Sequence, residues 1–520
     1  MMRTRGVCAN VGFWAYWTLC IWSYSCVESA SILMYFPIST PSHKNVFRPL
    51  AEALAEQGHQ VTVVTSIPDL HVKDNVTEIH VKLSRDLLYE MGQVATSQNG
   101  DNHSFRLISV LMNIRNCIYE AHLEALQHPE IRTLLLDPNT KFDLTFVFPL
   151  FNEVGYFLAK RFRSPLVLYM PAVANSLLTT SLGYFDNPTF ATTSTYEMAQ
   201  SETPGLFHRL IAIIIHLGYH HMKQWAFVNT QESLLKDLNI SHGTDLLQLE
   251  SEASFGMYFS HFAFDSIRPT LPNTIDIGLI HCVESKNLST ELSDWLNGED
   301  FIFVSFGSWI STDHLTLDSQ SILWETLQTL PVKVVLKVGK NSDRLRSNDR
   351  ILTGTWFPQQ DLLGHPSCRL FISQGGMMSL QESVFHGVPI LIIPFFGDQF
   401  ANAQRAARQG YGRKLEIQDL SHESLRESIM DILQNGSYRD QTQQVRSLLI
   451  DDISTPLEKA VFWSEYLIRH QGAMHLNFPG KHVGCLQFFH LDIWLTMGLV
   501  ISLLCYLLWK MSSWCLRKFL

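Results

Sequence analysis

Short apolar runs alternate with amphipathic runs along the first half of the chain. The series begins with SILMYF at 31–36, continues with VFRPLAEALAEQ at 46–57 and reaches QVTVVTS at 60–66. The middle run repeats its apolar residues at the spacing of one helical face, and Gly58 follows it as a helix stop. The pattern predicts a strand, a loop, a helix and a second parallel strand, the unit that opens a doubly wound α/β domain.

A second alternating series starts with FIFVSFGS at 301–308 and contains the apolar runs KVVLKVG, CRLFIS and VPILIIPFF. Two such series predict an α/β protein with two Rossmann-like doubly wound domains that face a cleft. We place the first domain at residues 30–275 and the second at 276–480. The first loop lacks a G-x-G-x-x-G pattern, so this unit is not predicted to bind a dinucleotide.

The N-terminus has the pattern of a signal peptide. Arg3 and Arg5 precede an apolar run at 11–27, and small residues follow it, so we assign residues 1–29 to a signal segment. A membrane helix that is retained is the alternative for this segment.

The C-terminus carries a second apolar run, IWLTMGLVISLLCYLLW, long enough to cross a hydrocarbon core of about 30 Å. We expect a transmembrane helix at 491–509, and the basic residues that follow indicate a cytosolic tail at 510–520. This is a single-pass type I topology with lumenal domains. Arg517 and Lys518, followed by two residues, resemble a retrieval tail for the endoplasmic reticulum membrane.

Charge and cysteine content narrow the classes of partner. Lys plus Arg number 39 and Asp plus Glu 49, so the net charge of -10 gives no electrostatic reason to bind nucleic acid. The cysteines between the two apolar ends are widely spaced and fit neither a metal site nor a disulfide scaffold. Five Asn-x-Ser/Thr tripeptides are candidate glycosylation sites: Asn75, Asn102, Asn239, Asn287 and Asn435.

An apolar segment with several histidines lies at 207–227. His216 and His220 have the i, i+4 spacing of helical metal ligands, but no Glu lies between them in the pattern that a zinc hydrolase needs. We therefore expect no metal here. We interpret the segment as a packed helix or as a helix that lines an acceptor pocket.

The densest chemical signal is a glycine turn between the strand LFIS and a helix. Gln374, Gly375 and Gly376 form the turn, and Gly387 ends the helix. Free backbone N–H groups at the start of such a helix favour an anion, and the glycines let a diphosphate approach closely. A plain strand-to-helix turn that requires positive φ is the alternative.

The stretch from Trp356 to Gln399 resembles, nearly end to end, the signature of the membrane-bound, detoxifying UDP-glycosyltransferases. The likeness continues in GLIHC, FVSFGS, GDQFANA and PLEKAVFWSEYLIRHQGAMHL, and it covers essentially the whole chain. The segment PSHKNVFRPL is more similar to insect members than to vertebrate ones. The resemblance implies a GT-B fold and a UDP-sugar as co-substrate, with no metal and no other cofactor.

The resemblance also implies a role for each matching residue. Trp356 would stack on the uracil with Gln359 beside it, and Glu382 would accept hydrogen bonds from the ribose hydroxyls. The other donor-site residues are Ser308, Gly375, Gly376 and Ser379 at the diphosphate, Asp398 and Gln399 at the sugar, and Gln374 before the glycine pair.

His43 matches the general base of the family, which takes the proton of the acceptor hydroxyl as its oxygen attacks the anomeric carbon from the face opposite UDP. An imidazole suits this step because its ordinary pKa of about 6.5 leaves it mostly neutral at lumenal pH. The displacement inverts the anomeric centre.

Two positions depart from the family pattern. Most relatives have His where this chain has Gln374, which keeps a hydrogen bond and loses a possible charge. The acid that orients the catalytic histidine is replaced by Phe148, and the nearest acid downstream is Glu153. We therefore assign the second catalytic role to Glu153 as a hypothesis.

We predict an enzyme that transfers glucose or glucuronate from its UDP-sugar to a small lipophilic acceptor. A catalytically weak or silent relative that binds lipophiles or a partner enzyme is the rival class, and Phe148 supports it. C-glycosylation is a third interpretation. The acceptor and the oligomeric state have no recognisable sequence pattern.

Overall fold

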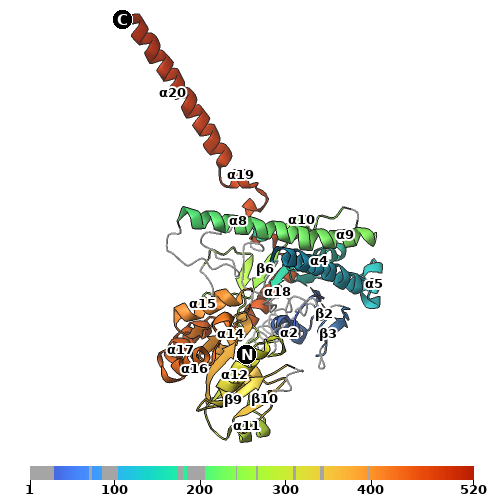
Figure 1. Cartoon of the computed structure of the whole chain (residues 1–520). Helices are drawn as coiled ribbons and strands as arrows, with labels where there is room; N and C mark the ends of the chain where they lie inside the picture. The colour runs from blue at the N-terminus through green and yellow to red at the C-terminus, as the bar shows by residue number, and fades with distance from the viewer. Residues whose placement is uncertain are drawn as a thin grey trace, which may run out of the picture.

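The computed structural model describes residues 29–68, 73–84, 103–171, 180–183, 205–241, 243–264, 268–307, 312–339, 345–395 and 397–519. Within these residues the chain forms two parallel β-sheets with helices packed around them, and a long helix that projects from the folded body (Figure 1). Ser308 and Asn102 lie outside the described residues, as does the signal segment up to residue 28.

The first sheet has seven parallel strands in the order β3-β2-β1-β4-β5-β6-β7. The chain builds outward from β1 in one direction and then returns to add β4 on its other side. The switch point therefore lies between β1 and β4, and ligands of such sheets collect beyond the carboxyl ends of these strands. The strands are β1 (Ser31–Phe36), β2 (Gln60–Thr65), β3 (Val76–His80), β4 (Leu144–Val147), β5 (Leu166–Met170), β6 (Phe255–Tyr258) and β7 (Thr274–Asp276).

The helix after β1 begins earlier than its apolar pattern predicted. Helix α2 spans Pro41–Glu56, so His43 lies in its first turn and not in the preceding loop. The reason is local chemistry, because Thr40 caps the helix by accepting a hydrogen bond from the N–H of His43 at 2.9 Å, and Pro41 stands at the start. The other helices of this domain are α4 (His103–Gln127), α5 (Pro129–Leu136), α6 (Val154–Phe162), α8 (Leu206–Met222), η2 (Lys223–Val228), α9 (Asn229–Asp237) and α10 (Leu246–Ser251).

The second sheet has the same kind of topology, with six parallel strands in the order β10-β9-β8-β11-β12-β13. Its switch point lies between β8 and β11. The strands are β8 (Phe301–Ser305), β9 (Lys333–Lys337), β10 (Ile351–Gly354), β11 (Cys368–Ser373), β12 (Ile390–Ile392) and β13 (Gly412–Lys414). The helices are α11 (Thr290–Leu296), α12 (Leu317–Gln328), α13 (Gln359–Leu363), α14 (Met377–Phe385), α15 (Gln399–Gln409), α16 (His422–Gln434) and α17 (Ser437–Ile450). The predicted pair of Rossmann-like domains is confirmed.

The chain returns to the first domain after the second sheet is complete. Helix α18 (Pro456–Arg469) packs against α2 and β4. Its Trp463 stacks on Phe255 of β6 with ring centroids 5.1 Å apart. Helix α18 follows α17 of the second domain and packs on the first domain, so it ties the two domains together.

The C-terminal helix α20 spans Leu491–Phe519 and follows the short helix α19 (Cys485–Phe488). Among the described residues it is the one helix long and apolar enough to cross a membrane: an 18-residue window within Leu491–Lys518 has a mean hydropathy of 2.0 and no buried residues. The helix continues through the basic segment that we had assigned to a tail. Figure 1 shows α20 extending away from both domains.

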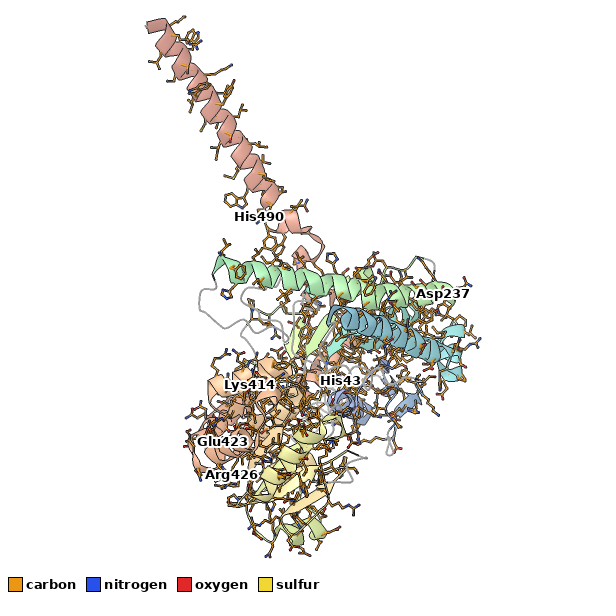
Figure 2. All side chains as sticks on the ribbon, viewed as in Figure 1. His43, Asp237, Lys414, Glu423, Arg426 and His490 are labelled. Atoms are coloured by element: carbon orange, nitrogen blue, oxygen red, sulfur yellow. The ribbon has the colours of Figure 1, made fainter. Side chains whose placement is uncertain are left out.

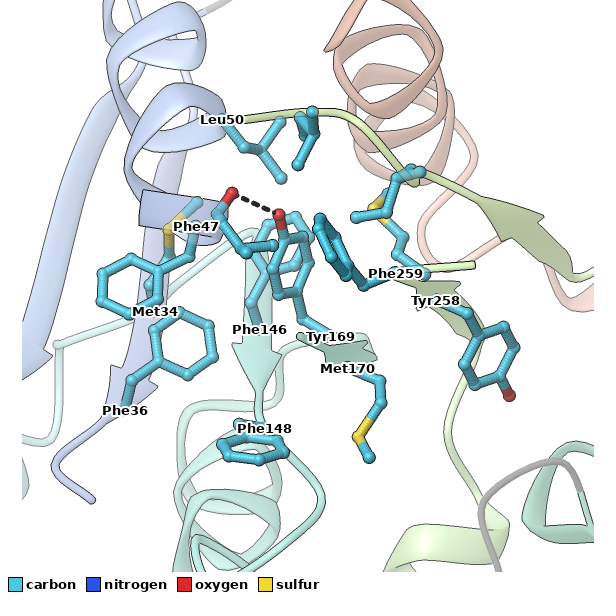
Figure 3. Close-up of a cluster of buried hydrophobic side chains, with 14 of the residues drawn as sticks. Met34, Phe36, Phe47, Leu50, Phe146, Phe148, Tyr169, Met170, Tyr258 and Phe259 are labelled. Atoms are coloured by element: carbon cyan, nitrogen blue, oxygen red, sulfur yellow. Dashed lines mark hydrogen bonds between the residues drawn. The ribbon is translucent and has the colours of Figure 1, made fainter. Parts of the chain in front are cut away.

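Aromatic side chains fill the core of the first domain. Phe36 of β1 stacks on Phe47 of α2 with centroids 4.5 Å apart. The hydroxyl of Tyr169 donates to the backbone carbonyl of Val46 at 2.8 Å, which satisfies the polar end of a buried ring (Figure 3). These contacts fix the start of α2 on the sheet.

The histidine-rich segment forms α8 and most of η2. The interpretation of it as a packed helix is wrong for the apolar face of α8, and the interpretation of it as a helix that lines an acceptor pocket stays a prediction. Ala212 is the one buried residue of α8, and most of the Leu and Ile side chains of this helix are exposed. A helical apolar stripe is the same in sequence whether the fold or another apolar phase covers it. Periodicity could not separate these two cases.

Candidate active site

The glycine turn of the second domain has the geometry of an anion site. Gly375 has φ +85°, and a Cβ there would come within 2.5 Å of Ile392, so only glycine fits. Gly376 is the N-cap of α14 and provides no capping side chain. The first N–H groups of α14 thus have no side-chain cap and carry the positive end of the helix dipole.

Neighbouring polar groups hold this turn in place. The side chain of Asn402 donates to the carbonyl of Gly375 at 2.9 Å, and the hydroxyl of Ser373 donates to Gln374 Oε1 at 2.9 Å. Gly307, which follows β8, has φ +85°, and a Cβ there would lie 2.3 Å from Gln374 Nε2. The loops after β8 and β11 therefore meet at the switch point of the second sheet, as a nucleotide site in this fold class requires.

The predicted ribose ligand, Glu382, is held by a polar cluster on α13 and α14. Gln359 Nε2 donates to Ser379 Oγ at 3.2 Å and to Glu382 Oε2. Burial raises the pKa of Glu382 to about 7, and the hydrogen bond from Gln359 lowers it in part. The structure thus brings together three of the residues that the resemblance assigned to the donor.

His281 joins this cluster, although its role was not predicted. Its Nε2 lies 3.4 Å from Glu382 Oε1 and 3.3 Å from the carbonyl of Met378. Burial lowers the pKa of His281 to about 4, so the ring is neutral and the contact is not an ion pair. The signal was the segment GLIHC, which carried the family likeness without indicating what its histidine touches.

The segment around His281 also docks on the donor helices. Gln381 Oε1 accepts from the N–H of Leu279 at 2.8 Å. Gln360 donates to the carbonyl of His281 at 3.0 Å and accepts from the N–H of Val283 at 2.8 Å. The connection between the two sheets is therefore fixed directly to α13 and α14.

The remaining donor residues follow other strands of the second sheet. Trp356 follows β10 and is 74% exposed, so its indole face is open to a flat ring. Asp398 is the N-cap of α15 and accepts from Asn402 Nδ2 at 3.0 Å, while burial raises its pKa. Gln399 is buried and accepts from the N–H of Phe395 at 2.9 Å. Asp398 is thus linked through Asn402 to the carbonyl of Gly375.

His43 lies in the first turn of α2, directly after the loop that follows β1 (labelled in Figure 2). Its ring meets Phe148 edge to face, with centroids 5.1 Å apart and planes at 80°. Burial lowers the pKa of His43 to about 4, and its Nδ1 has no hydrogen-bond partner among the described residues. His43 is thus a neutral imidazole that an aromatic neighbour positions.

Asn152 fixes the loop that leads into His43. Its Oδ1 accepts from the N–H of Ile38 at 2.9 Å, and its Nδ2 donates to the carbonyl of Ile38 at 3.0 Å. This paired contact joins the segment after β4 to the segment after β1, across the switch point. No sequence motif indicated this residue.

Glu153 has a different set of neighbours from the one we hypothesised. It is fully buried, Gln231 Nε2 donates to its Oε2, and the ion pair of Lys223 and Glu250 lies near enough to influence its pKa. Burial is the main effect and raises that pKa. The described contacts join Glu153 to α9 and show no polar contact with His43.

The candidate glycosylation sites in the described residues are all exposed. They are Asn75, Asn239, Asn287 and Asn435. The described residues contain no group of three or more His, Cys, Asp and Glu side chains that could hold a metal ion. His216 and His220 lie against each other with ring centroids 4.5 Å apart.

The two parallel sheets, each with helices around it, define a GT-B fold. Solved structures support this fold: a glycotransferase of kitacinnamycin has a TM-score of 0.55 at 16% identity, with 85% of this chain and 99% of that chain covered. Phytolacca americana UGT2, complexed with UDP-2-fluoro-glucose and pterostilbene, has a TM-score of 0.56 at 16% identity and the same coverage.

The chain belongs to the UDP-glucoronosyl and UDP-glucosyl transferase family, which it matches over residues 32–520. It is 29% identical to UDP-glucosyltransferase 2 of Dactylopius coccus, over 90% of this chain and 89% of that protein. It is 27% identical to the human 2-hydroxyacylsphingosine 1-beta-galactosyltransferase, over 96% and 91%. Human UDP-glucuronosyltransferase 1A3 is 28% identical over 94% and 92%. The protein is therefore a UDP-glycosyltransferase, and the predicted family is confirmed.

Proposed function

We propose that this enzyme transfers glucose or glucuronate from its UDP-sugar to a hydroxyl group of a small lipophilic acceptor, with inversion and without a metal. The observation that carries the donor half is the uncapped start of α14 beside the cluster of Gln359, Ser379 and Glu382. The diphosphate would bind the free N–H groups, and the ionised carboxylate would accept from the ribose.

His43 supplies the acceptor half of the proposal. The acceptor oxygen forms the new bond to the anomeric carbon, the bond to UDP breaks, and the acceptor proton moves to a neutral imidazole nitrogen. Because burial lowers the pKa of His43 to about 4, the ring is unprotonated and ready to accept at neutral pH. The diphosphate leaves with the electron pair, and the N–H groups of α14 stabilise its charge.

The experiment is transfer by the full chain in detergent micelles. UDP-glucose, UDP-glucuronate and UDP-galactose are each offered with phenol, steroid and aliphatic alcohol acceptors, and products are identified by mass. A gain of one hexose or one hexuronic acid, with UDP released and the product anomer inverted, is expected. Loss of transfer in His43→Ala, with UDP binding kept, separates the base from the donor site. No product from any pair, with UDP still bound, would favour the silent relative.

The silent relative and C-glycosylation remain second candidates because of one contact. Phe148 occupies the place beside His43, and His43 Nδ1 has no described polar partner. A weakly oriented base lowers the rate of transfer to oxygen more than that to an activated carbon. Acid hydrolysis of the product distinguishes the two transfers, because a C-glycoside resists it.

We further propose that α20 anchors the enzyme in the endoplasmic reticulum membrane as a single-pass type I protein. The exposed sequons support a lumenal location for both domains. The test is a shift in mass after endoglycosidase treatment of intact microsomes, combined with protection of both domains from added protease. Digestion of the domains in sealed microsomes would show that the domains face the cytosol and not the lumen.

A further inference from the structure

Helix α8 presents an apolar face to the outside of the folded domains. Six side chains on this face are between 44% and 77% exposed. They are Leu206, Phe207, Leu210, Ile213, Ile214 and Leu217. Their spacing places them on one side of the helix, and Ala212 on the other side is buried. A contiguous apolar surface of this size marks a contact with another apolar phase.

The position of α8 relative to the membrane anchor identifies that phase. Figure 1 shows α8 lying across the end of the folded body from which α20 projects. The segment before the anchor is fixed to the first domain, because Lys481 Nζ donates to the carbonyl of Ala253 at 2.8 Å and Lys481 packs on Gly183. Leu491 is ten positions after Lys481, so α20 begins within about 35 Å of this fixed point.

The charges of α8 are compatible with lipid headgroups. Residues 206–222 contain no Asp or Glu, and the exposed Arg209 lies beside the apolar stripe. The connection to the anchor adds apolar side chains of its own, because Leu486 and Phe489 are exposed between Lys481 and α20. Exposed apolar side chains therefore lie both on α8 and on the connection that leads to the anchor.

We propose that α8 lies in the plane of the same bilayer that α20 spans, with its apolar face at the boundary between headgroups and acyl chains. An amphipathic helix in this position binds through its apolar area, and basic side chains remain at headgroup level. Two attachments, α20 and α8, then hold the first domain in one orientation on the membrane. This inference does not depend on the reaction that the enzyme catalyses.

The experiment uses the full chain in phosphatidylcholine nanodiscs with a photoreactive diazirine placed either near the glycerol or at the end of the acyl chain. Trypsin cuts after Arg209 and Lys223 and so releases a peptide that carries most of the α8 face. We expect the shallow probe to label this peptide and the deep probe to leave it unlabelled. Peptides of α20 should take both labels, because that helix spans the bilayer.

A matched pair of variants tests the face itself. The triple change Leu210→Ser, Ile213→Ser and Leu217→Ser should lower shallow labelling of the α8 peptide several-fold while labelling of α20 stays the same. The control is Leu448→Ser, Ile450→Ser and Ile453→Ser, which removes apolar side chains of the second domain that are at least 51% exposed and should change neither label.

The labelling of the unaltered chain is informative even if a variant fails to fold. Equal recovery of both peptides with label on α20 alone would overturn the proposal. Chemical cross-links between the α8 peptides of two chains, without lipid label, would assign the face to a second copy and would also overturn it. Deep labelling of α8 would show that the helix inserts instead of lying in the interface.

Discussion

The ring of Phe148 meets the imidazole of His43 edge to face, with centroids 5.1 Å apart and planes at 80°. Phe148 follows β4 and His43 lies in the first turn of the helix after β1, so the switch point of the first sheet brings them together (Figure 3 shows Phe148 at the end of β4). A carboxylate at position 148 would fix the tautomer of the histidine and stabilise the imidazolium. Phe148 can only pack against the ring.

Phe148→Asp should therefore raise transfer to aliphatic alcohols by at least about tenfold, a part of the ~10²–10⁴ that a general base contributes. Phenols should gain less, because they lose their proton without much help. The new carboxylate should also raise the pKa of His43 from about 4. The acidic limb of the pH profile of kcat/KM then moves to higher pH. The control is Phe148→Asn, which has a similar shape without the charge; an equal gain in that variant would contradict the electrostatic reason.

Glu153→Gln tests whether His43 recruits the next acid along the chain. The carboxylate is held by Gln231 and is fully buried, so recruitment requires the side chain to leave this bond. We expect turnover to be unchanged within about twofold, because an amide can keep a polar contact with Gln231. A loss of more than about a hundredfold in kcat, with the KM for UDP-sugar unchanged, would assign Glu153 the catalytic role after all.

Trp356→Ala should weaken UDP binding by about 1–3 kcal/mol, the range measured for loss of base stacking on an aromatic ring. The indole is 74% exposed, so its removal should leave the melting temperature nearly unchanged. Calorimetry with UDP measures the affinity. Trp225→Ala, in the first domain, removes another exposed indole and should leave UDP affinity unaltered; unchanged affinity in both variants would remove the uracil role from Trp356.

The sequence predicted the parts of this fold that depend on local pattern. The runs 31–36 and 60–66 became β1 and β2, and Gly375 adopts the positive φ that the glycine turn indicated. The sequence pattern predicted a loop at His43, because the apolar repeat of α2 begins only at Val46. Thr40 and Pro41 start the helix earlier by capping and preset φ, which the apolar repeat does not report.

The parts that were missed depend on contacts between distant segments. The contact between His281 and Glu382 joins residues about a hundred positions apart, and no periodic pattern in the sequence extends over such a separation. The paired hydrogen bonds between Asn152 and Ile38 have the same character. The exposure of the α8 face could not be predicted from the sequence either, because a stripe of Leu and Ile predicts burial without indicating what covers it.

The pKa of Glu382 predicts a pH-dependent cost to folding. Burial raises this pKa from 4.5 to about 7, so the folded state holds a proton that the unfolded state has lost between these two values. The raised pKa means that stability falls as pH rises from about 4.5 to about 7, and the cost stays at higher pH. Glu382→Gln should thus raise the melting temperature at about pH 8 and leave it unchanged at about pH 4. An equal effect at both values, measured by scanning calorimetry, would show that packing and not ionisation is responsible.

The same group should make UDP binding depend on pH in the opposite direction. The ribose hydroxyls donate, so they bind the ionised carboxylate, and below about pH 7 a proton must first leave Glu382. Affinity should therefore fall by up to about tenfold, ~1.4 kcal/mol, for each unit of pH below that value.

UDP carries a phosphate that titrates in a similar range, so the comparison is with Glu382→Gln, in which only the phosphate contributes. The difference between the two affinity curves should be largest above pH 7 and should vanish towards pH 5, with proton release seen as a dependence of binding enthalpy on the buffer. Parallel curves across this range would mean that Glu382 does not accept from the ribose. The cluster of Gln359, Ser379 and His281 would then maintain the shape of the site without selecting the nucleoside.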